Sequence, residues 1–458
     1  MHRTLGMAAA VAVFAVTSAA PPVAVADRDD RYVSGRHDDD GHHGRGYYDE
    51  HGQKKEDGSI QLGPRPFYLV DGMDDGRLKD RLMQCKKGPF YRSDFSIGHR
   101  GAALQFPEHT KESYKAAARQ GAGIVECDVT FTNDKRLVCR HAENDLHTTT
   151  NILLTDLAPT CKTPFTPATF DSSGQRLTDA VAECRTSALT LGQFRTLRGK
   201  MDAFNPAART VEEFVGGTAP WRTDLYTGRG TLMTFEESIK LNEKHGVKHT
   251  PELKGGDPAK IKAVFGGQEG YAQAFADVLH DAGVKPRDVW PQSFNVNDVL
   301  YWIAKTAYGR QAVFLVDYDA AKDNILLFNR DGKQLENRED QLKFFKELKQ
   351  AKVRIIAPAM PALLAFDANG RIVPSQLAKD LKGMGFDIIT WTFERSDLRL
   401  GASKAGFYYD FDPTGKAVMK DSDMYKALDV LARGVGILGI FSDWPATVTY
   451  YANCMGLK

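Results

Sequence analysis

The residues of this chain that could carry out chemistry are concentrated at the ends of short apolar segments. They comprise two histidines, two cations and three carboxylates: His99, His141, Arg100, Lys254, Glu126, Asp128 and Glu252. Successive side chains of a strand point to opposite faces, so residues one position apart share a face. The two acids at 126 and 128 therefore point the same way, as do the acid at 252 and the lysine at 254.

Three carboxylates that meet in one place require charge compensation. Buried like charges are costly unless a cation lies between them or their pKa values rise. An all-oxygen ligand set suits Ca²⁺ or Mg²⁺ better than zinc, which prefers imidazole or thiolate. We therefore predict that Glu126, Asp128 and Glu252 bind one divalent cation, Ca²⁺ or Mg²⁺. The alternative is a salt-bridge network with Arg100 and Lys254, and the two nearby histidines favour the metal.

His99 and His141 carry imidazoles, which exchange protons near neutral pH. Either histidine alone would more often be structural. Beside a metal and the cations Arg100 and Lys254, however, the pair fits phosphoryl transfer: the cations offset phosphate charge while the imidazoles serve the attacking and leaving oxygens. The chain carries no P-loop and no Rossmann glycine pattern, so these motifs imply no nucleotide cofactor.

Short apolar, β-branched segments alternate with helical ones along the chain, which is typical of βαβ units and a parallel sheet. One helix is expected at residues 110–120, and a capping box from Thr234 to Glu237 opens another. Eight strands close a (β/α)8 TIM barrel, whose catalytic groups gather at the carboxyl ends of the strands. The eight expected strands are residues 95–98, 123–129, 247–253, 289–294, 312–316, 354–357, 387–392 and 436–442.

About a hundred residues separate the second expected strand from the third, which is too long for one connection. Residues 136–141 are expected to form the return arm of a hairpin from the second strand. The rest, about 153–232, is an insertion rich in Thr, Pro and Gly. Loops at this end of a barrel rise beside the site, so we predict a cap over it. The alternative is a peripheral decoration.

The first residues of the chain are typical of an export signal. His2 and Arg3 precede an apolar run that ends in Ala24-Val25-Ala26, an A-x-A cleavage pattern. We predict that residues 1–26 are removed and that the protein is exported, periplasmic or secreted; the alternative is a membrane anchor. No later stretch is long and apolar enough to cross a bilayer.

Residues 27–60 are rich in Asp, His, Gly and Arg and cannot bury enough surface to order, so we predict a disordered tail. Its histidines offer a transition-metal site as the alternative function. We expect residues 61–458 to form the barrel domain. Removal of Arg3 balances the 60 basic against the 59 acidic residues, which is not typical of a nucleic-acid partner.

Six cysteines in an exported chain favour disulfides. Cys161 and Cys184 bracket one Pro/Thr/Ser-rich stretch of the insertion, and we predict that they pair. Cys85 and Cys454 lie just outside the first and last barrel elements, which closure of the barrel makes neighbours, and we predict a second bond there.

Two further cysteines, Cys127 and Cys139, lie on the two arms of the expected hairpin. A turn at residues 133–134 would place them on opposite faces, which argues against a bond. We expect both to be buried thiols.

The order of short motifs resembles one known family. The run Gly98-His99-Arg100-Gly101, Pro107-Glu108-His109-Thr110, Gly121-Ala122, Glu126-x-Asp128-Val129, Thr132-x-Asp134 and His141 is similar to the opening signature of the glycerophosphodiester phosphodiesterases. Later segments continue the resemblance from residue 96 to residue 451: Pro251-Glu252-Leu253-Lys254, Gln292-Ser293-Phe294, Trp391-Thr392-Phe393 and the closing run from Gly436 to Pro445.

The resemblance implies metal-dependent hydrolysis of a small-molecule phosphodiester, a deacylated phospholipid, to sn-glycerol 3-phosphate and an alcohol. It implies that His99 and His141 are the acid/base pair, and that Arg100 and Lys254 hold the phosphate. Glu126, Asp128 and Glu252 would be the metal ligands. Phe294 and Trp391 would wall the glycerol pocket, their alternative being barrel-core packing.

The chain departs from the family pattern at one loop. Asp usually follows the second histidine directly, whereas Ala142 follows His141 here and the loop is one residue longer. Two other functions compete with hydrolysis of glycerophosphodiesters. One is a phospholipase D-like or sphingomyelinase D-like activity on lysophospholipids, which an apolar groove through the insertion would favour. The other is a non-catalytic surface binding protein, which the intact set of seven polar residues argues against.

Overall fold

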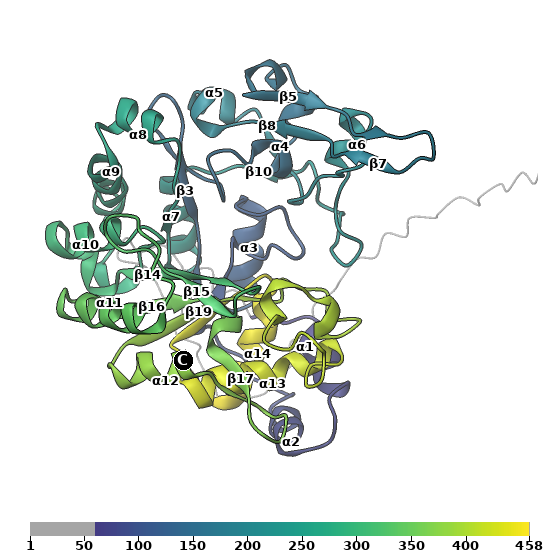
Figure 1. Cartoon of the computed structure of the whole chain (residues 1–458), viewed down its shortest axis with the longest axis vertical. Helices are drawn as coiled ribbons and strands as arrows, with labels where there is room; N and C mark the ends of the chain where they lie inside the picture. Colours follow the sequence, from purple (N-terminus) through teal and green to yellow (C-terminus); the bar gives the residue numbers. More distant parts are fainter. Residues whose placement is uncertain (1–59, 458) are drawn as a thin grey trace, which may run out of the picture. The chain divides into compact units, whose positions relative to one another are not determined.

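The computed structural model describes residues 60–457 of the chain. The expected signal peptide and nearly all of the expected tail lie outside the described residues. In Figure 1 the helices α8 to α12 lie along one side of the strands β14, β16 and β19, and a group of short elements that includes α5, α6, β5, β7 and β8 lies at the top of the view. None of the helices within residues 60–457 combines the length and apolar content of a bilayer span.

All eight expected strands are present, and two of them are interrupted. The second expected strand consists of β2 (Ala122–Val125) and β3 (Asp128–Phe131), and the third of β11 (Lys248–His249) and β12 (Glu252–Leu253). The other six are β1 (Ser93–Gly98), β13 (Gln292–Ser293), β14 (Val313–Asp319), β16 (Ile355–Pro358), β19 (Asp387–Phe393) and β20 (Gly439–Ser442).

The strand order shows that the sheet closes on itself. Parallel neighbours run β11-β2-β1-β20-β19-β16-β14-β13-β12-β3. Because β11 and β12 are two parts of one segment, and β2 and β3 are two parts of another, the path returns to the strands at which it began. The fold is therefore the expected (β/α)8 barrel.

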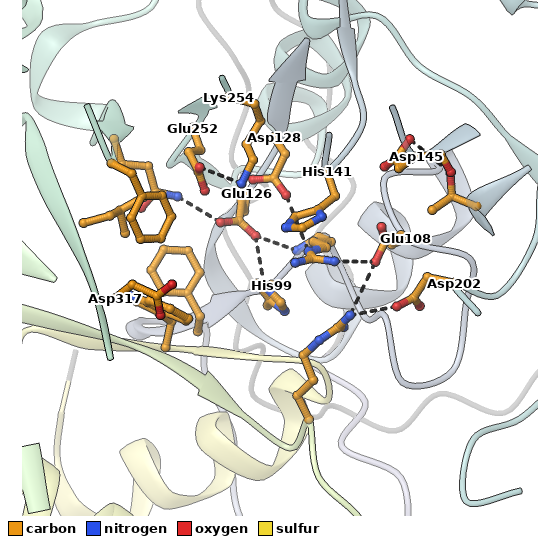
Figure 2. A pocket seen from close by; sticks show the side chains of 18 of the residues that line it. His99, Glu108, Glu126, Asp128, His141, Asp145, Asp202, Glu252, Lys254 and Asp317 are labelled. Atoms are coloured by element: carbon orange, nitrogen blue, oxygen red, sulfur yellow. Dashed lines mark hydrogen bonds and ion pairs between the residues drawn. The ribbon is translucent and has the colours of Figure 1, made fainter. Parts of the chain in front are cut away.

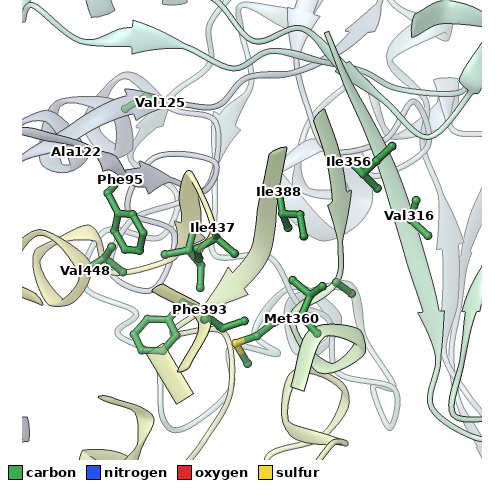
Figure 3. Close-up of a cluster of buried hydrophobic side chains, with 14 of the residues drawn as sticks. Phe95, Ala122, Val125, Val316, Ile356, Met360, Ile388, Phe393, Ile437 and Val448 are labelled. Carbon is green, nitrogen blue, oxygen red and sulfur yellow. The ribbon is translucent and has the colours of Figure 1, made fainter. Parts of the chain in front are cut away.

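Alternation along the strands builds two hydrophobic layers. On β14, Val313 and Leu315 belong to a cluster inside the barrel, whereas Phe314 and Val316 belong to the large cluster between strands and helices. Figure 3 shows part of this outer cluster, including Val316 on its strand. The inward series on β14 ends with Asp317, which lines the cavity at the carboxyl end of the barrel.

The helices begin where the sequence predicts. The hydroxyl of Thr110 accepts from the backbone N–H of Ser113 to open α3 (Lys111–Arg119), and the predicted capping box opens α7 (Phe235–Lys244). Further helices are α8 (Pro258–Phe265), α9 (Gln268–Asp281), α10 (Val296–Lys305), α11 (Arg338–Gln350), α12 (Gln376–Gly383), α13 (Met424–Asp429) and α14 (Pro445–Met455), with α1 (Arg65–Asp71) and α2 (Arg77–Gln84) before the barrel.

The long second connection contains a hairpin and then the insertion. The hairpin's return arm is β4 (Leu137–Cys139), antiparallel to β3 as predicted. The insertion has its own buried cluster, which includes Leu191, Phe194 and Phe214. The connection's remaining elements are α4 (Leu146–Thr149), α5 (Leu191–Phe194), α6 (Val211–Val215), β5 (Thr163–Thr166), β6 (Thr169–Phe170), β7 (Arg176–Thr178), β8 (Val181–Glu183), β9 (Arg198–Gly199) and β10 (Gly230–Thr231).

The structure contains the two predicted disulfides and a third that was not predicted. Cys85 pairs with Cys454, and Cys161 pairs with Cys184. Cys127 and Cys139, which we expected to be separate thiols, are also bonded, with their Cα atoms 5.3 Å apart.

The hairpin register explains why that expectation was wrong. The backbone N–H of Thr132 donates to the carbonyl of Arg136, so the loop contains three residues, with Lys135 in the left-handed region at φ 61°. A two-residue loop at 133–134 would shift the pairing by one position. In the observed register Cys139 lies opposite Val129, on the same face as Cys127.

Candidate active site

A cavity of about 610 Å³ lies at the carboxyl ends of the barrel strands. The residues singled out from the sequence all line it, and Figure 2 shows most of the polar ones converging there. They are His99, Arg100, Glu126, Asp128, His141, Glu252, Lys254, Phe294 and Trp391.

Three buried carboxylates form the most compact feature of the cavity. Glu126, Asp128 and Glu252 each offer an oxygen within 4.8 Å of the others. Glu126 lies in the interruption between β2 and β3, and Asp128 is the first residue of β3. Glu252 opens β12 directly beside Asp128 in the parallel register. The barrel strands themselves therefore hold these three side chains together.

Hydrogen bonds hold two of the acids in place. Glu126 accepts from the Nε2 amide of Gln292 at 2.9 Å and from the backbone N–H of Arg100 at 3.0 Å. Asp128 Oδ2 accepts from Nε2 of His109 at 2.9 Å, and Nδ1 of that ring lies 3.0 Å from the hydroxyl of Tyr114. Because a carboxylate only accepts, the proton of His109 belongs on Nε2.

The donor set fits a hard divalent cation. Oδ1 of Asp128 is buried and has no hydrogen-bond partner, which is costly for a carboxylate oxygen unless a cation satisfies it. Burial, together with repulsion from Asp128 and Glu252, raises the pKa of Glu126 well above its usual range. Burial likewise raises the pKa of Glu252 to about 7. A bound cation would lower both pKa values by stabilising the charged forms.

Two cations stand beside the carboxylates. Nη1 of Arg100 donates to Glu108 at 2.8 Å, while its Nε lies 3.4 Å from Oδ2 of Asp128. Nζ of Lys254 lies 2.7 Å from Oε1 of Glu252. Arg100 itself has a left-handed backbone at φ 53°, an uncommon conformation for a side chain of this size.

The two histidines face the same space from different strands. Nδ1 of His99 lies 2.5 Å from Oδ1 of Asp443, so this nitrogen carries the proton and Nε2 is left toward Glu126, 3.8 Å away. Burial, then the charge of Arg100, lowers the pKa of His99 to about 4. Burial and the charges of Arg100 and Lys254 lower the pKa of His141 well below its usual value.

A chain of charged contacts behind His99 was not predicted. Nη1 of Arg395 donates to Asp443 at 2.8 Å, and its Nη2 donates to Asp202 at 2.7 Å. Asp443 belongs to the closing motif of the resemblance, which was the one sequence signal for it. Asp202 comes from the insertion, which also contributes Ala203 to the cavity lining.

The aromatic residues line another part of the cavity. The Phe294 side chain is 41% exposed, which excludes core packing, and its ring meets that of Trp391 edge to face at 5.7 Å. Phe407 and Tyr408 also line the cavity and contact Trp391. In Figure 2 Asp317 lies on the opposite side of His99 and Glu126 from Asp202.

Two acids hold the loop after His141. Neither was predicted, because this loop departs from the family pattern. Asp145 accepts from the backbone N–H of Ala142 at 3.1 Å and lines the cavity; burial raises its pKa to about 6. Glu143 is buried and accepts from the backbone N–H of Asp257 at 2.8 Å. The longer loop therefore has its own set of anchoring contacts.

The sequence of this chain is similar to those of known proteins. The profile of the glycerophosphoryl diester phosphodiesterase family matches residues 99–447. An extracellular protein of Arthroderma benhamiae is 40% identical over 261 residues, which are 56% of this chain and 100% of that protein. Glycerophosphodiester phosphodiesterase GDPD6 of Arabidopsis thaliana is 21% identical over 399 residues, 84% of this chain and 91% of that protein.

The fold is also similar to those of solved structures. The structure of an Oleispira antarctica phosphodiesterase in complex with the product sn-glycerol 3-phosphate aligns with a TM-score of 0.45 and 17% identity, over 78% of this chain and 95% of that one.

Proposed function

Because the chain belongs to the glycerophosphoryl diester phosphodiesterase family, we propose that it hydrolyses glycerophosphodiesters to sn-glycerol 3-phosphate and an alcohol, with one bound Ca²⁺ or Mg²⁺. One observation carries the proposal: His99 and His141 line the same cavity as the three-carboxylate cluster. An acid/base pair beside a hard-cation site is what displacement at a phosphodiester requires.

Glu126, Asp128 and Glu252 would hold the cation, with the buried, unsatisfied Oδ1 of Asp128 as one ligand atom. When bound, the cation would offset the negative charge of the phosphate. Gln292 and His109 keep the acids oriented through their hydrogen bonds. Such outer partners raise metal affinity because they fix the ligand atoms before binding.

Arg100 and Lys254 would bind the phosphate oxygens from the protein side. Arg100 is buried and Lys254 is largely buried, and both line the cavity. Each makes fewer contacts with carboxylates than it has N–H groups, since a guanidinium has five and an ammonium three. In a site that excludes water, their attraction for a phosphate is stronger than it would be in bulk solvent.

The two imidazoles would move the protons. Lowered pKa values keep both rings neutral at neutral pH, so each can accept a proton. Because Asp443 holds the proton of His99 on Nδ1, Nε2 of His99 is the atom that exchanges a proton at the reacting centre. One imidazole takes the proton of the attacking hydroxyl. The other must be protonated before it can supply a proton to the leaving oxygen, and the negative charge of a bound phosphate would raise its pKa and favour that form.

Phe294 and Trp391 would wall the glycerol pocket, since both line the cavity and meet edge to face. On the other side the insertion lines the cavity with Asp202 and Ala203. An ion-paired carboxylate suits a small polar head group more than an acyl chain, so this lining favours deacylated substrates over lysophospholipids.

We also propose that the protein is exported, periplasmic or secreted. Three disulfides in the described residues support this, because such bonds persist in oxidising compartments. The name of the Arthroderma benhamiae relative, an extracellular protein, points the same way.

The test is product identification with two substrates. Purified protein with Ca²⁺ or Mg²⁺ should convert glycerophosphocholine to sn-glycerol 3-phosphate, followed by phosphorus NMR, and should act far more slowly on lysophosphatidylcholine. Faster release of choline from the lysolipid would support the phospholipase D-like alternative instead. No turnover of any glycerophosphodiester at all would overturn the proposal.

A further inference from the structure

The third disulfide lies inside the catalytic framework. Cys127 stands between Glu126 and Asp128, and Cys139 lies two residues before His141. A single cross-link therefore joins the segment that bears two of the three carboxylates to the segment that bears one of the two histidines. Residues adjoining the other four cysteines do not line the cavity.

The cross-link lies at the point where a barrel strand changes partners. Up to Val125 the strand pairs with β1, and the N–H of Glu126 donates to the carbonyl of Gly98 at 3.0 Å. From Asp128 onward it pairs with β4 on that side instead. The strand therefore diverges from β1 at Cys127, between the two ligand acids, where regular pairing does not constrain the backbone on both sides.

The hairpin is also open at this end. Its tight turn lies at residues 132–136, and its pairing continues only as far as the N–H of Arg140, which donates to the carbonyl of Asp128 at 2.8 Å. The next residue is His141. Separation of the two strands from this end would displace Asp128 and His141 together. The disulfide prevents that separation because it links the two strands covalently.

The disulfide is well placed to act without entering the cavity. Glu126 and Asp128 point into the cavity, whereas Cys127 and Cys139 pack in the outer hydrophobic cluster with Val129. Both cysteines are buried, 4% and 0% exposed. The bond therefore touches neither a substrate nor a cation, and acts through the residues on either side of it.

We propose that the Cys127–Cys139 disulfide is a positioning element that holds Glu126, Asp128 and His141 in register and thereby raises the affinity of the site for its divalent cation. The inference rests on the proposed function, since it concerns the same metal site. A bond that served stability alone would leave cation affinity unchanged once the protein is folded.

The chain offers a matched control in the Cys161–Cys184 disulfide. It closes a loop with a sequence separation of 23, against 12 for Cys127–Cys139. The stabilisation expected from loop closure changes slowly with loop length, so removing either bond should cost a similar amount of stability. The variants to compare are Cys127→Ala/Cys139→Ala and Cys161→Ala/Cys184→Ala, each free of new thiols.

The measurement is calorimetric titration of each folded protein with Ca²⁺ and with Mg²⁺. We expect Cys127→Ala/Cys139→Ala to bind the cation at least tenfold more weakly than wild type, and the control variant to stay within twofold. Unchanged affinity in both variants, or equal weakening in both, would overturn the inference. Wild-type protein that binds neither cation would instead overturn the metal site of the proposed function, and this inference with it.

A second measurement needs no variant to fold. Linkage is reciprocal, so a bond that strengthens cation binding tenfold must itself be strengthened tenfold by the cation. Wild-type protein is equilibrated with mixtures of reduced and oxidised dithiothreitol. When reduced dithiothreitol reduces a protein disulfide to two thiols, its own two thiols are oxidised to a cyclic disulfide. Alkylation and mass spectrometry then report each cysteine pair.

Reduction of Cys127–Cys139 requires a certain ratio of reduced to oxidised dithiothreitol. Saturating Ca²⁺ or Mg²⁺ should raise that ratio at least tenfold. The ratio that opens Cys85–Cys454 should change less than twofold. Equal protection of both bonds would indicate general stabilisation of the folded state, and no protection of either would indicate no coupling; both results contradict the proposal.

Discussion

Nδ1 of His99 and Oδ1 of Asp443 lie 2.5 Å apart, although 344 positions separate the two residues in the chain. The contact joins the end of the first barrel strand to the end of the last, so closure of the barrel creates it. Arg395 holds the second oxygen of Asp443 at 2.8 Å and connects it to Asp202 of the insertion. The proton-transfer atom of His99 is thus fixed by residues from three separate parts of the chain.

Asp443→Asn should lower kcat by a factor on the order of 10² to 10⁴ while leaving the protein folded. The amide would present an N–H to Nδ1 and favour the tautomer with its proton on Nε2, which removes the acceptor at the reacting centre. Steady-state kinetics with glycerophosphocholine measure the effect. The control, Asp277→Asn on the exposed face of α9, removes a charge outside the site; a loss under threefold in Asp443→Asn would contradict this role.

His99→Ala and His141→Ala should each reduce kcat on the order of a hundredfold or more with an alkyl alcohol as leaving group. The histidine that protonates the leaving oxygen matters little when that oxygen belongs to 4-nitrophenol, which departs without help. We therefore expect one variant, and only one, to regain most of its activity on the 4-nitrophenyl ester of glycerol phosphate. Recovery in both variants, or in neither, would exclude a division of labour between acid and base.

His109→Ala should weaken cation binding by about 10- to 100-fold, because the hydrogen bond from Nε2 to Asp128 orients that ligand. His109→Gln should retain most of the affinity, since its amide nitrogen can occupy the place of Nε2. Calorimetric titration with Ca²⁺ measures both. Equal loss of affinity in the two variants would show that His109 contributes packing and not orientation.

Histidine burial should make the fold sensitive to acid. Burial lowers the pKa of His249 to about 4, whereas the unfolded chain keeps the ordinary value of about 6.5. Between these values the unfolded state binds more protons, so the stabilisation is complete above about pH 6.5 and is lost as the pH falls toward 4. Its full extent is about 3 kcal/mol.

The measurement is urea unfolding of wild type and His249→Gln at pH 7.5 and pH 5. The free energy of unfolding should fall less between these pH values in the variant, because glutamine does not titrate. His280→Gln removes an exposed histidine from α9 and should leave the wild-type difference intact. If His249→Gln lost as much stability as wild type on acidification, burial of this imidazole would not be the cause.

The barrel could be predicted because its strands combine β-branched runs with polar residues at their carboxyl ends. The interruptions could not, because the breaks at Glu126 and between His249 and Glu252 arise where a strand changes neighbours. The position of such a change depends on how the sheet closes and not on the local sequence pattern. The register of the β3–β4 hairpin was missed for a smaller reason: Lys135 takes a left-handed conformation that favours glycine or asparagine, so the third loop residue gave no signal.

The cavity residues that the sequence indicated are those whose type and spacing already suggest a cation or a proton transfer, such as Glu126 and His141. Their supporting partners were missed because a partner is defined by contact. Gln292 and Asp443 occurred in motifs without an evident task, and Asp202 lies in an insertion without a recognisable pattern. Asp202 and Arg395 come together only when the chain is folded.

The most direct test of the account is the release of sn-glycerol 3-phosphate from glycerophosphocholine by protein stripped with EDTA, measured as Ca²⁺ or Mg²⁺ is added back. Wild type should be inactive when stripped and should recover with saturation at one site, and Glu252→Gln should need at least tenfold more cation. Full activity of the stripped protein, or unchanged cation dependence in Glu252→Gln, would contradict metal-dependent hydrolysis at this site.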